Sequence, residues 1–154
     1  MLIFLDIDGV MVPAKSWKSP ELLMDGFPAF DLRAVKVLQN LISDNTTIVL
    51  TTSHKSRFSI QEWKEIFQKR SIQVEKLASL CENINNLNRK DEILNWFNLN
   101  DVNESFVIID DDKSLNDLPP FLKNKLVLIS PIIGLTDNNL VEIETALNQS
   151  SEAA

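Results

Sequence analysis

The stretch Leu2-Ile3-Phe4-Leu5-Asp6-Ile7-Asp8-Gly9-Val10 opens the chain with an apolar run that ends in two aspartates and a glycine. A strand that is apolar at every position is buried on both faces, which is typical of a parallel sheet. Side chains two residues apart leave a strand on the same face, so Asp6 and Asp8 are expected to point at one spot. Gly9 lets the backbone turn sharply and leaves the space above these carboxylates free of a side chain.

Similar apolar runs recur along the chain and alternate with segments of helical period. This alternation predicts an α/β fold, a doubly wound parallel sheet of about five strands with helices on both faces and right-handed crossovers. The predicted strands are Leu2–Ile7, Thr47–Thr51, Phe106–Ile109, Leu126–Ile129 and the less apolar Ile72–Val74. The predicted helices are Leu32–Ile42 behind an Asp31 N-cap, Ile60–Lys69 behind a Ser59–Glu62 capping box, Asp91–Phe97, and Asn138–Leu147.

Length and composition indicate one domain over residues 1–148. With 154 residues, 44% of them hydrophobic, the chain is long enough for one core. The small polar tail 149–154 is expected to fray. Residues 11–30 lack a period and are expected to form a loop or small flap where such sheets bind ligands, with Trp17 either stacking on a ligand or packing on the domain. Trp63, Trp96 and Cys81 are expected to be buried.

Charge and composition exclude several classes of protein. Fifteen Lys and Arg against 22 Asp and Glu give a net charge of -7, which argues against binding that depends on neutralising a nucleic-acid backbone, although a local basic patch stays open. One cysteine and one histidine exclude an internal disulfide and a Cys/His zinc site. No glycine-rich phosphate loop occurs among the three glycines. The first residues suit neither a signal peptide nor a membrane span, so we expect a cytoplasmic protein.

A second acidic cluster, Asp110-Asp111-Asp112, follows another apolar strand. If this strand lies beside the first, three or four carboxylates converge at the carboxyl edge of the sheet. Such a cluster repels itself unless a divalent cation lies within it, and its oxygen ligands suit Mg²⁺. The sequence therefore predicts a magnesium site, while Asp112 is expected to cap a turn or helix.

Hydroxyls and cations follow the strand that starts at Thr47. Thr51, Thr52 and Ser53 compete for one role in holding phosphoryl oxygens, because a shift of one residue at the strand end reverses which side chain faces the site. Of the three we choose Thr52. Ser53, His54, Lys55 and Arg57 form a predicted basic rim for the rest of a substrate, unless they are simply solvated. Lys90, at a predicted helix start, would bring a positive charge to the phosphate and the aspartates, with the adjacent Arg89 as the alternative.

Four stretches of this sequence resemble, in the same order, the motifs of the haloacid dehalogenase (HAD) superfamily of aspartate-nucleophile phosphotransferases. They are Leu5–Val10, Ile48–Ser53, Lys90 and Val107–Asp112. The short length and small first insert are similar to those of the HAD domain of Swiss Army Knife RNA repair proteins, although His54 replaces the tryptophan expected after Thr-Ser. The resemblance implies a HAD-like (Rossmannoid) sheet without a separate cap domain.

The resemblance also implies roles for individual residues. Asp6 would be the nucleophile that forms an aspartyl-phosphate, and Asp8 would act as general acid and then as general base. Thr52 and Lys90 would hold the phosphoryl oxygens. The implied Mg²⁺ site consists of Asp6, the backbone carbonyl of Asp8, Asp110 and Asp111. Asp110 would also fix Lys90 and a metal-bound water.

The expected function is therefore that of a Mg²⁺-dependent phosphatase. An uncapped site is open to large substrates, and the family resemblance favours phosphorylated ends of nucleic acids or nucleotides. Small phosphoesters and phosphoproteins are the alternative substrates. A second hypothesis is a non-catalytic binding module of the same fold, but four intact motifs argue against it.

Overall fold

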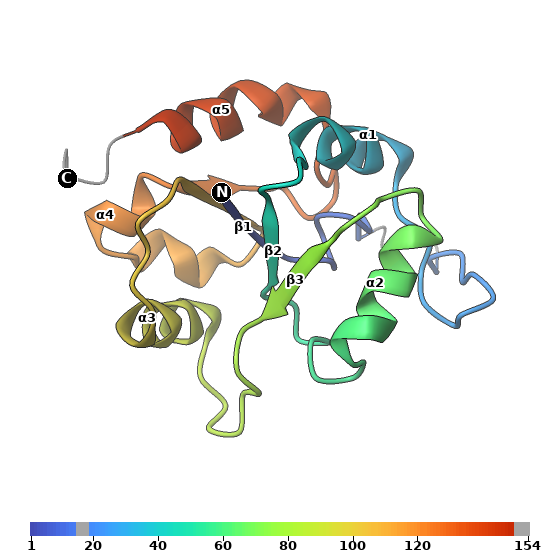
Figure 1. The fold of residues 1–154 in the computed structure, drawn as a ribbon, viewed down its shortest axis with the longest axis horizontal. Helices are drawn as coiled ribbons and strands as arrows, with labels where there is room; N and C mark the ends of the chain where they lie inside the picture. The colour runs from blue at the N-terminus through green and yellow to red at the C-terminus, as the bar shows by residue number, and fades with distance from the viewer. Residues whose placement is uncertain (15–18, 150–154) are drawn as a thin grey trace.

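The computed structural model describes residues 1–14 and 19–149 and shows a five-stranded parallel sheet between two layers of helices (Figure 1). Trp17 and almost all of the predicted frayed tail lie outside the described residues. The elements run in this order along the chain: β1 Leu2–Leu5, α1 Leu32–Leu41, β2 Thr47–Leu50, α2 Ile60–Gln68, β3 Lys76–Ser79, α3 Arg89–Leu99, β4 Phe106–Asp110, a 3-10 helix Lys113–Asp117, α4 Pro120–Lys123, β5 Leu126–Leu128, a 3-10 helix Asp137–Asn139 and α5 Leu140–Asn148.

The sheet has the strand order β3-β2-β1-β4-β5, so β1 lies at its centre. Leu5 pairs in register with Leu50 of β2 on one side and with Ile109 of β4 on the other. The predicted neighbourhood of the two acidic strands is therefore confirmed, as is the α/β class. Because all strands are parallel, the residues after β1, β2 and β4 meet at one edge of the sheet.

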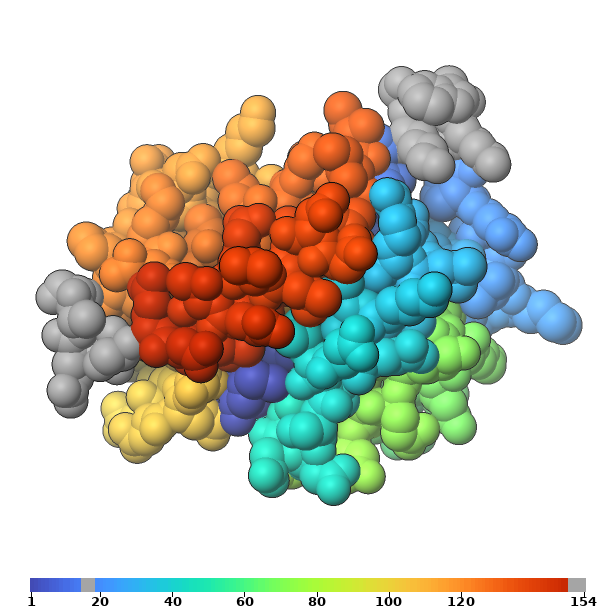
Figure 2. Space-filling view, turned by 90° about the horizontal axis from the view of Figure 1, so that it is seen from above, coloured from blue at the N-terminus to red at the C-terminus, as the bar shows by residue number. Residues whose placement is uncertain are grey.

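Alternate residues of β1 belong to two different cores. Ile3 and Leu5 pack with the buried residues of α1, α2 and α5, whereas Phe4 packs on the other face with those of α3 and α4. Figure 1 shows α1 and α5 together on one side, with α3 and α4 on the other. The short helix before α5 lies against α1, and Figure 2 looks onto this face. Burial on both faces explains why β1 is apolar at every position.

Helix starts follow the local signals in the sequence. Asp31 accepts a hydrogen bond from the backbone of Arg33, and Ser59 and Glu62 form the predicted capping box. Asn88, which was not predicted as a cap, accepts from the backbone N–H of Asp91, so α3 begins at Arg89 and not at Asp91. These caps supply partners for the free N–H groups of each first turn.

The predicted strand at Ile72–Val74 is wrong, since β3 spans Lys76–Ser79. Ile72 and Val74 are buried, but Ile72 closes the end of α2 by donating to Phe67 O, after Ser71 adopts a positive φ of 65°. β3 is an edge strand that is paired only with β2 and is partly exposed. An edge strand needs less apolar sequence, so its pattern is weak.

Several smaller expectations have mixed outcomes. Trp63 is fully buried and Trp96 is partly buried against Phe4, but Cys81 is exposed. Between β1 and α1 the described residues form loops with two isolated bridges, and no separate cap domain is present among them. In residues 1–14 and 19–149, no helix is both long enough and apolar enough to cross a membrane.

Candidate active site

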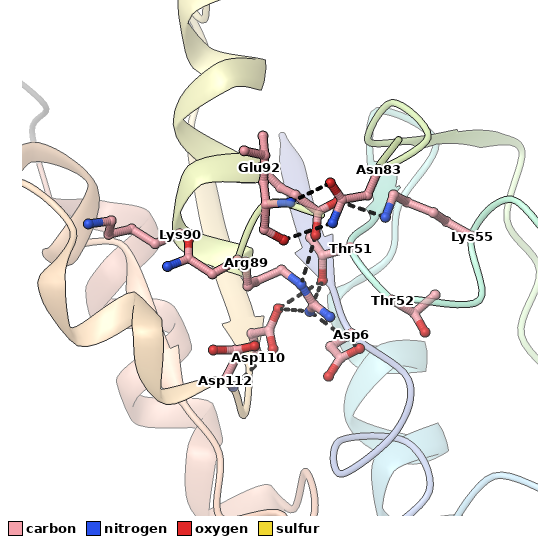
Figure 3. Close-up of polar contacts among 12 residues, drawn as sticks. Asp6, Thr51, Thr52, Lys55, Asn83, Arg89, Lys90, Glu92, Asp110 and Asp112 are labelled. Carbon is pink, nitrogen blue, oxygen red and sulfur yellow. Dashed lines mark hydrogen bonds and ion pairs between the residues drawn. The ribbon is translucent and has the colours of Figure 1, made fainter. Parts of the chain in front are cut away.

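Three carboxylates meet at the carboxyl edge of the sheet, and Figure 3 labels two of them, Asp6 and Asp110. Asp6 directly follows β1, Asp110 ends β4, and Asp111 comes next. The parallel register places Asp6 beside Asp110, and the N–H of Asp6 donates to Ile109 O at 3.1 Å. One oxygen from each carboxylate lies within 4.8 Å of the other two. This geometry supplies three oxygen ligands for one cation.

Gly9 makes room for this arrangement. Its φ is +82°, and a Cβ built there would lie 2.0 Å from Oδ2 of Asp111. A side chain at this position would therefore both strain the backbone and displace the carboxylate. The sequence-based explanation of Gly9, a sharp turn with free space above the carboxylates, is confirmed.

Arg89, the first residue of α3, is the cation that reaches the cluster. Its Nη1 lies 2.6 Å from Oδ2 of Asp110 and 3.6 Å from Oδ1 of Asp6, and it also donates to Oγ1 of Thr51 at 3.2 Å. The side chain of Lys90 points away from the aspartates, while its N–H donates to Ser114 Oγ (Figure 3). Because successive residues of a helix point in different directions, only one of the pair faces the sheet.

The predicted placement of Lys90 at the aspartates is therefore wrong, and the alternative, Arg89, occupies that position. The N-cap at Asn88 was the missed signal, since it fixes Arg89 as the first residue of the helix. Asp112 caps the following 3-10 helix by accepting from the N–H of Ser114, as predicted.

Electrostatics at this edge is dominated by crowded negative charge. Burial, and then the charge of Asp110, raise the pKa of Asp6 to about 9, although Arg89 acts in the opposite direction. Burial is also the main cause of the raised pKa of Asp111. Burial lowers the pKa of Arg89, but Asp110 and Asp6 outweigh this effect and raise it. A second cation beside the carboxylates would relieve this repulsion and favour their ionised forms.

The donor set fits Mg²⁺. All three converging ligands are carboxylate oxygens, which hard divalent cations prefer. The surrounding network contains four carboxylates and two cationic side chains, an excess of two formal negative charges. The carboxylates belong to Asp6, Glu92, Asp110 and Asp111, and the cations are Lys55 and Arg89.

The two threonines after β2 have different partners. Thr51 donates from Oγ1 to Oδ2 of Asp110 at 2.8 Å, so it orients that carboxylate. Thr52 is also fully buried, and its Oγ1 accepts from the N–H of His54 at 3.3 Å. Ser53 is exposed. With Thr51 engaged by Asp110 and Arg89, Thr52 stays our candidate for holding a phosphoryl oxygen.

Asp8 does not join the three converging carboxylates. Its carboxylate is 56% exposed, and its Oδ2 lies 2.7 Å from Nε2 of His54. The side chains of Asp6 and Asp8 therefore have different partners, because β1 ends at Leu5 and Asp8 lies in the loop beyond it. Their predicted convergence on one spot is not confirmed. The predicted contact between the Asp8 carbonyl and a metal stays a prediction.

The predicted basic rim is only partly present. Ser53 and Arg57 are exposed, and the Arg57 guanidinium lies over the ring of Phe58, while His54 faces Asp8. Lys55 is wrong as a rim residue. Its side chain is 4% exposed, and its Nζ lies 2.7 Å from Oε2 of Glu92.

The turn after β2 explains why Lys55 points inward. The N–H of Lys55 donates to Thr52 O, and the carbonyl of Lys55 accepts from Nε1 of the buried Trp63. The opposite charge of Glu92 offsets the cost of burying the ammonium. Glu92 Oε1 also lies 3.7 Å from Nε of Arg89, so the pair joins the loop after β2 to the cation of the site. Glu92 was not among the predicted site residues, although its spacing of three residues from Arg89 on a helix was a usable signal.

A hollow of about 450 Å³ lies between α3 and the loop that leads into it. Glu92 forms part of its wall together with Asn83 and Trp96. Through Glu92 the hollow adjoins the charged network of Arg89.

The central parallel sheet with paired acidic strand ends, and with a cation from the helix after β3, has the arrangement of the haloacid dehalogenase class of α/β domains. A family model described as the HAD domain in Swiss Army Knife RNA repair proteins matches residues 2–140, and the chain belongs to this family. Membership supports a HAD-type hydrolase at a coarse level. A search of curated proteins and a search of solved structures gave no significant match.

Proposed function

We propose that this protein is a Mg²⁺-dependent phosphohydrolase that acts through an aspartyl-phosphate on Asp6. The observation that carries the proposal is the convergence of Asp6, Asp110 and Asp111 within 4.8 Å, with Arg89 beside them. A non-catalytic module would gain nothing from burying this excess of negative charge, because burial of like charges costs free energy.

In the first step, an oxygen of Asp6 attacks phosphorus in line, and the bond from phosphorus to the leaving oxygen breaks. Asp8 gives its proton to that leaving oxygen, which departs as an alcohol. In the second step, Asp8 accepts a proton from a water molecule whose oxygen attacks the phosphorus. Inorganic phosphate leaves, and Asp6 is regenerated as a carboxylate.

The remaining residues bind and orient. Arg89 holds Asp6 and Asp110 in place and brings positive charge to the phosphoryl oxygens, while Thr52 supplies a hydroxyl to one of them. Asp110 and Asp111, with Asp6, would hold Mg²⁺, which when bound offsets the negative charge of the carboxylates and the phosphoryl group. Thr51 keeps Asp110 oriented.

We propose phosphorylated ends of nucleic acids or nucleotides as the substrates, in accord with the family to which the chain belongs. The site lies on a domain whose described residues include no separate cap, which suits a large substrate. The net charge of -7 restricts the grip to the few phosphates nearest the site. Small phosphoesters and phosphoproteins are the alternative outcomes of the test below.

The test is a phosphate-release screen in Mg²⁺ across mononucleotides, oligonucleotides with a 3′- or 5′-phosphate, sugar phosphates and phosphopeptides. We expect the wild type to release phosphate most efficiently from the nucleotide ends. Asp6→Asn should lower turnover by about four orders of magnitude or more, because an amide cannot attack phosphorus.

Asp112→Asn is the matched control, because Asn also caps well and Asp112 serves as a cap. It should leave turnover close to that of the wild type. Asp8→Asn should accumulate a phosphoenzyme, which intact-protein mass spectrometry detects as the mass of one phosphoryl group. Near wild-type turnover in Asp6→Asn, or no turnover of any substrate by the wild type, would contradict the proposal.

A further inference from the structure

Among the described residues, His54 has a side chain that contacts the carboxylate of Asp8. Its Nε2 lies 2.7 Å from Oδ2 of Asp8, within hydrogen-bond distance. No other described side chain is hydrogen-bonded to that carboxylate. A half-exposed carboxylate with one partner owes its direction largely to that partner, because solvent alone does not select a rotamer.

The backbone of His54 is fixed by the turn after β2. Its N–H donates to Oγ1 of Thr52 at 3.3 Å, and its carbonyl accepts from the N–H of Arg57 at 2.9 Å. Thr52 is itself fully buried, two residues after the end of the interior strand β2. The residue that contacts Asp8 is therefore tied to the rigid sheet edge that also carries Asp6.

The ring of His54 is fixed by Phe27, from the loop between β1 and α1. The two ring centroids are 5.9 Å apart and the rings are perpendicular. Phe27 is almost fully buried and makes further edge contacts with Phe58 and Trp63. The wall behind the imidazole is thus a packed aromatic cluster and not a mobile side chain.

Arg70 holds the loop that carries Phe27. Its Nη2 donates to Phe27 O at 2.9 Å, and its Nε donates to Pro28 O at 2.9 Å. Both its Nη atoms also contact the carboxylate of Asp25. A continuous set of contacts therefore runs from Arg70 through Phe27 and His54 to Asp8.

We propose that His54 is a positioning residue that aims the carboxyl of Asp8 at the leaving oxygen. Nε2–H of the imidazole donates to Oδ2, which leaves Oδ1 of Asp8 free to pass its proton to the substrate. When the phosphorus–oxygen bond breaks, that proton moves from Oδ1 to the leaving oxygen, and the Asp8 carboxylate keeps its bond from His54. This role replaces the predicted contact of His54 with substrate, and it rests on the proposed phosphohydrolase function.

The test exploits leaving groups that differ in their need for a proton. Dinitrophenyl phosphate releases a stable phenolate without protonation, whereas an alkyl or nucleoside phosphate releases an alkoxide that needs a general acid. The value of kcat/KM reports the loss of transition-state stabilisation, so it is measured for both substrates in the same enzyme preparation.

His54→Asn and His54→Gln form a matched pair. The amide nitrogen of Gln reaches about as far as Nε2 of His, whereas that of Asn falls short of Asp8. We expect His54→Asn to lower kcat/KM by about 10- to 100-fold for the nucleoside phosphate and by less than about 3-fold for dinitrophenyl phosphate. His54→Gln should recover most of the loss, and Asp8→Asn should show the same selectivity as His54→Asn with a larger effect.

The exposed Ser56, which lies in the same turn, provides the control variant Ser56→Ala, with both kcat/KM values unchanged. An equal loss on the two substrates, a change in KM alone, or failure of His54→Gln to recover activity would overturn the positioning role while the phosphatase stands. Absence of wild-type turnover on both substrates would instead overturn the phosphatase proposal, and this role with it. Melting temperatures of the Asn and Gln variants identify any loss caused by unfolding.

Discussion

Two arginines of this protein, the buried Arg70 and the mostly buried Arg89, have contrasting electrostatic surroundings. Arg70 pairs with one carboxylate, Asp25, and its other N–H groups donate to backbone carbonyls, so its charge and its donors are matched. Arg89 lies among the carboxylates of Asp6, Asp110 and Glu92, where negative charge is in excess. A matched ion pair stabilises a loop, whereas an unmatched cluster creates a demand for further positive charge.

The two arginines differ in the role of their charge. Arg70 stabilises the fold, whereas Arg89 belongs to the candidate site. Arg70 joins the end of α2 to the loop of Phe27, and nothing at that place calls for a ligand. At the sheet edge, the raised pKa of Asp6, about 9, reflects burial and like charge that the fold leaves uncompensated. Such a cluster is typical of a site that binds a cation and an anionic substrate together.

Between the two arginines, the larger loss of activity is expected from breaking the unmatched cluster at Arg89. Arg89→Ala should lower kcat/KM by about 10²- to 10³-fold, because the donors that face the phosphoryl group and the aspartates are lost. Lys90→Ala, which removes an adjacent cation that points elsewhere, should change kcat/KM by less than about 3-fold. Steady-state phosphate release measures both. A greater loss in Lys90→Ala than in Arg89→Ala would contradict the assignment of the cation.

Breaking the matched pair should change stability. Arg70→Ala removes the hydrogen bonds that Arg70 donates to Asp25 and to three backbone carbonyls, and we expect the free energy of unfolding to fall by about 3–5 kcal/mol. Arg33, whose ion pair with Asp31 is exposed, provides the control, since Arg33→Ala should hardly change the urea midpoint. Equal urea midpoints for the two variants would show that the Arg70 contacts do not stabilise the fold.

Much of the fold was predictable because its signal is local. Buried parallel strands are apolar at every position, so β1, β2, β4 and β5 are evident in the sequence, and the caps at Asp31 and Ser59 mark helix starts. The predicted position of β3 was too early in the chain, because an edge strand is only partly buried and the apolar pair Ile72 and Val74 lies just before it. Ile72 and Val74 are buried without pairing to a neighbouring strand, so their apolar character did not mark a strand.

The site was predictable only in part, because some of it depends on the phase of a helix and on contacts between distant segments. Asp6 and Asp111 directly follow strands and Asp110 ends one, so strand order alone brings them together. Whether Arg89 or Lys90 faces the aspartates depends on where α3 begins. Moving that start by one residue would exchange the two side chains. The burial of Lys55 against Glu92 joins segments far apart in sequence, and no local pattern encodes it.

Mg²⁺ should distinguish the surroundings of Arg89 from those of Arg70, because only the carboxylates near Arg89 are expected to bind the cation. If Mg²⁺ binds only the folded protein, at about 100 times its dissociation constant it adds about 2.7 kcal/mol to the free energy of unfolding. We expect a higher melting temperature in Mg²⁺, reversal by EDTA, and loss of the shift in Asp111→Ala. Asp112→Asn should keep the shift, because Asp112 caps a 3-10 helix. An unchanged shift in Asp111→Ala would indicate a different set of ligands.

The smallest effect is expected at low pH, where the matched pair is tested by its own titration. Hydrogen bonds from Arg70, and then one from the N–H of Phe27, lower the pKa of Asp25 to about 2. The unfolded chain should titrate this group at about 3.9. Because the folded state binds the proton less readily, the pair contributes its full stability above about pH 4 and loses it as the pH falls toward about 2.

Urea unfolding between about pH 5 and pH 2 measures this contribution. The wild type should lose about 1–2 kcal/mol more than Asp25→Asn over that interval, since the amide has no proton to take up and the 11% exposure of Asp25 allows some screening. Asp101→Asn, at an exposed position, should follow the wild-type profile. Parallel profiles for the wild type and Asp25→Asn would mean that the ion pair with Arg70 contributes no charge-dependent stability, and that its value lies in the carbonyl contacts alone.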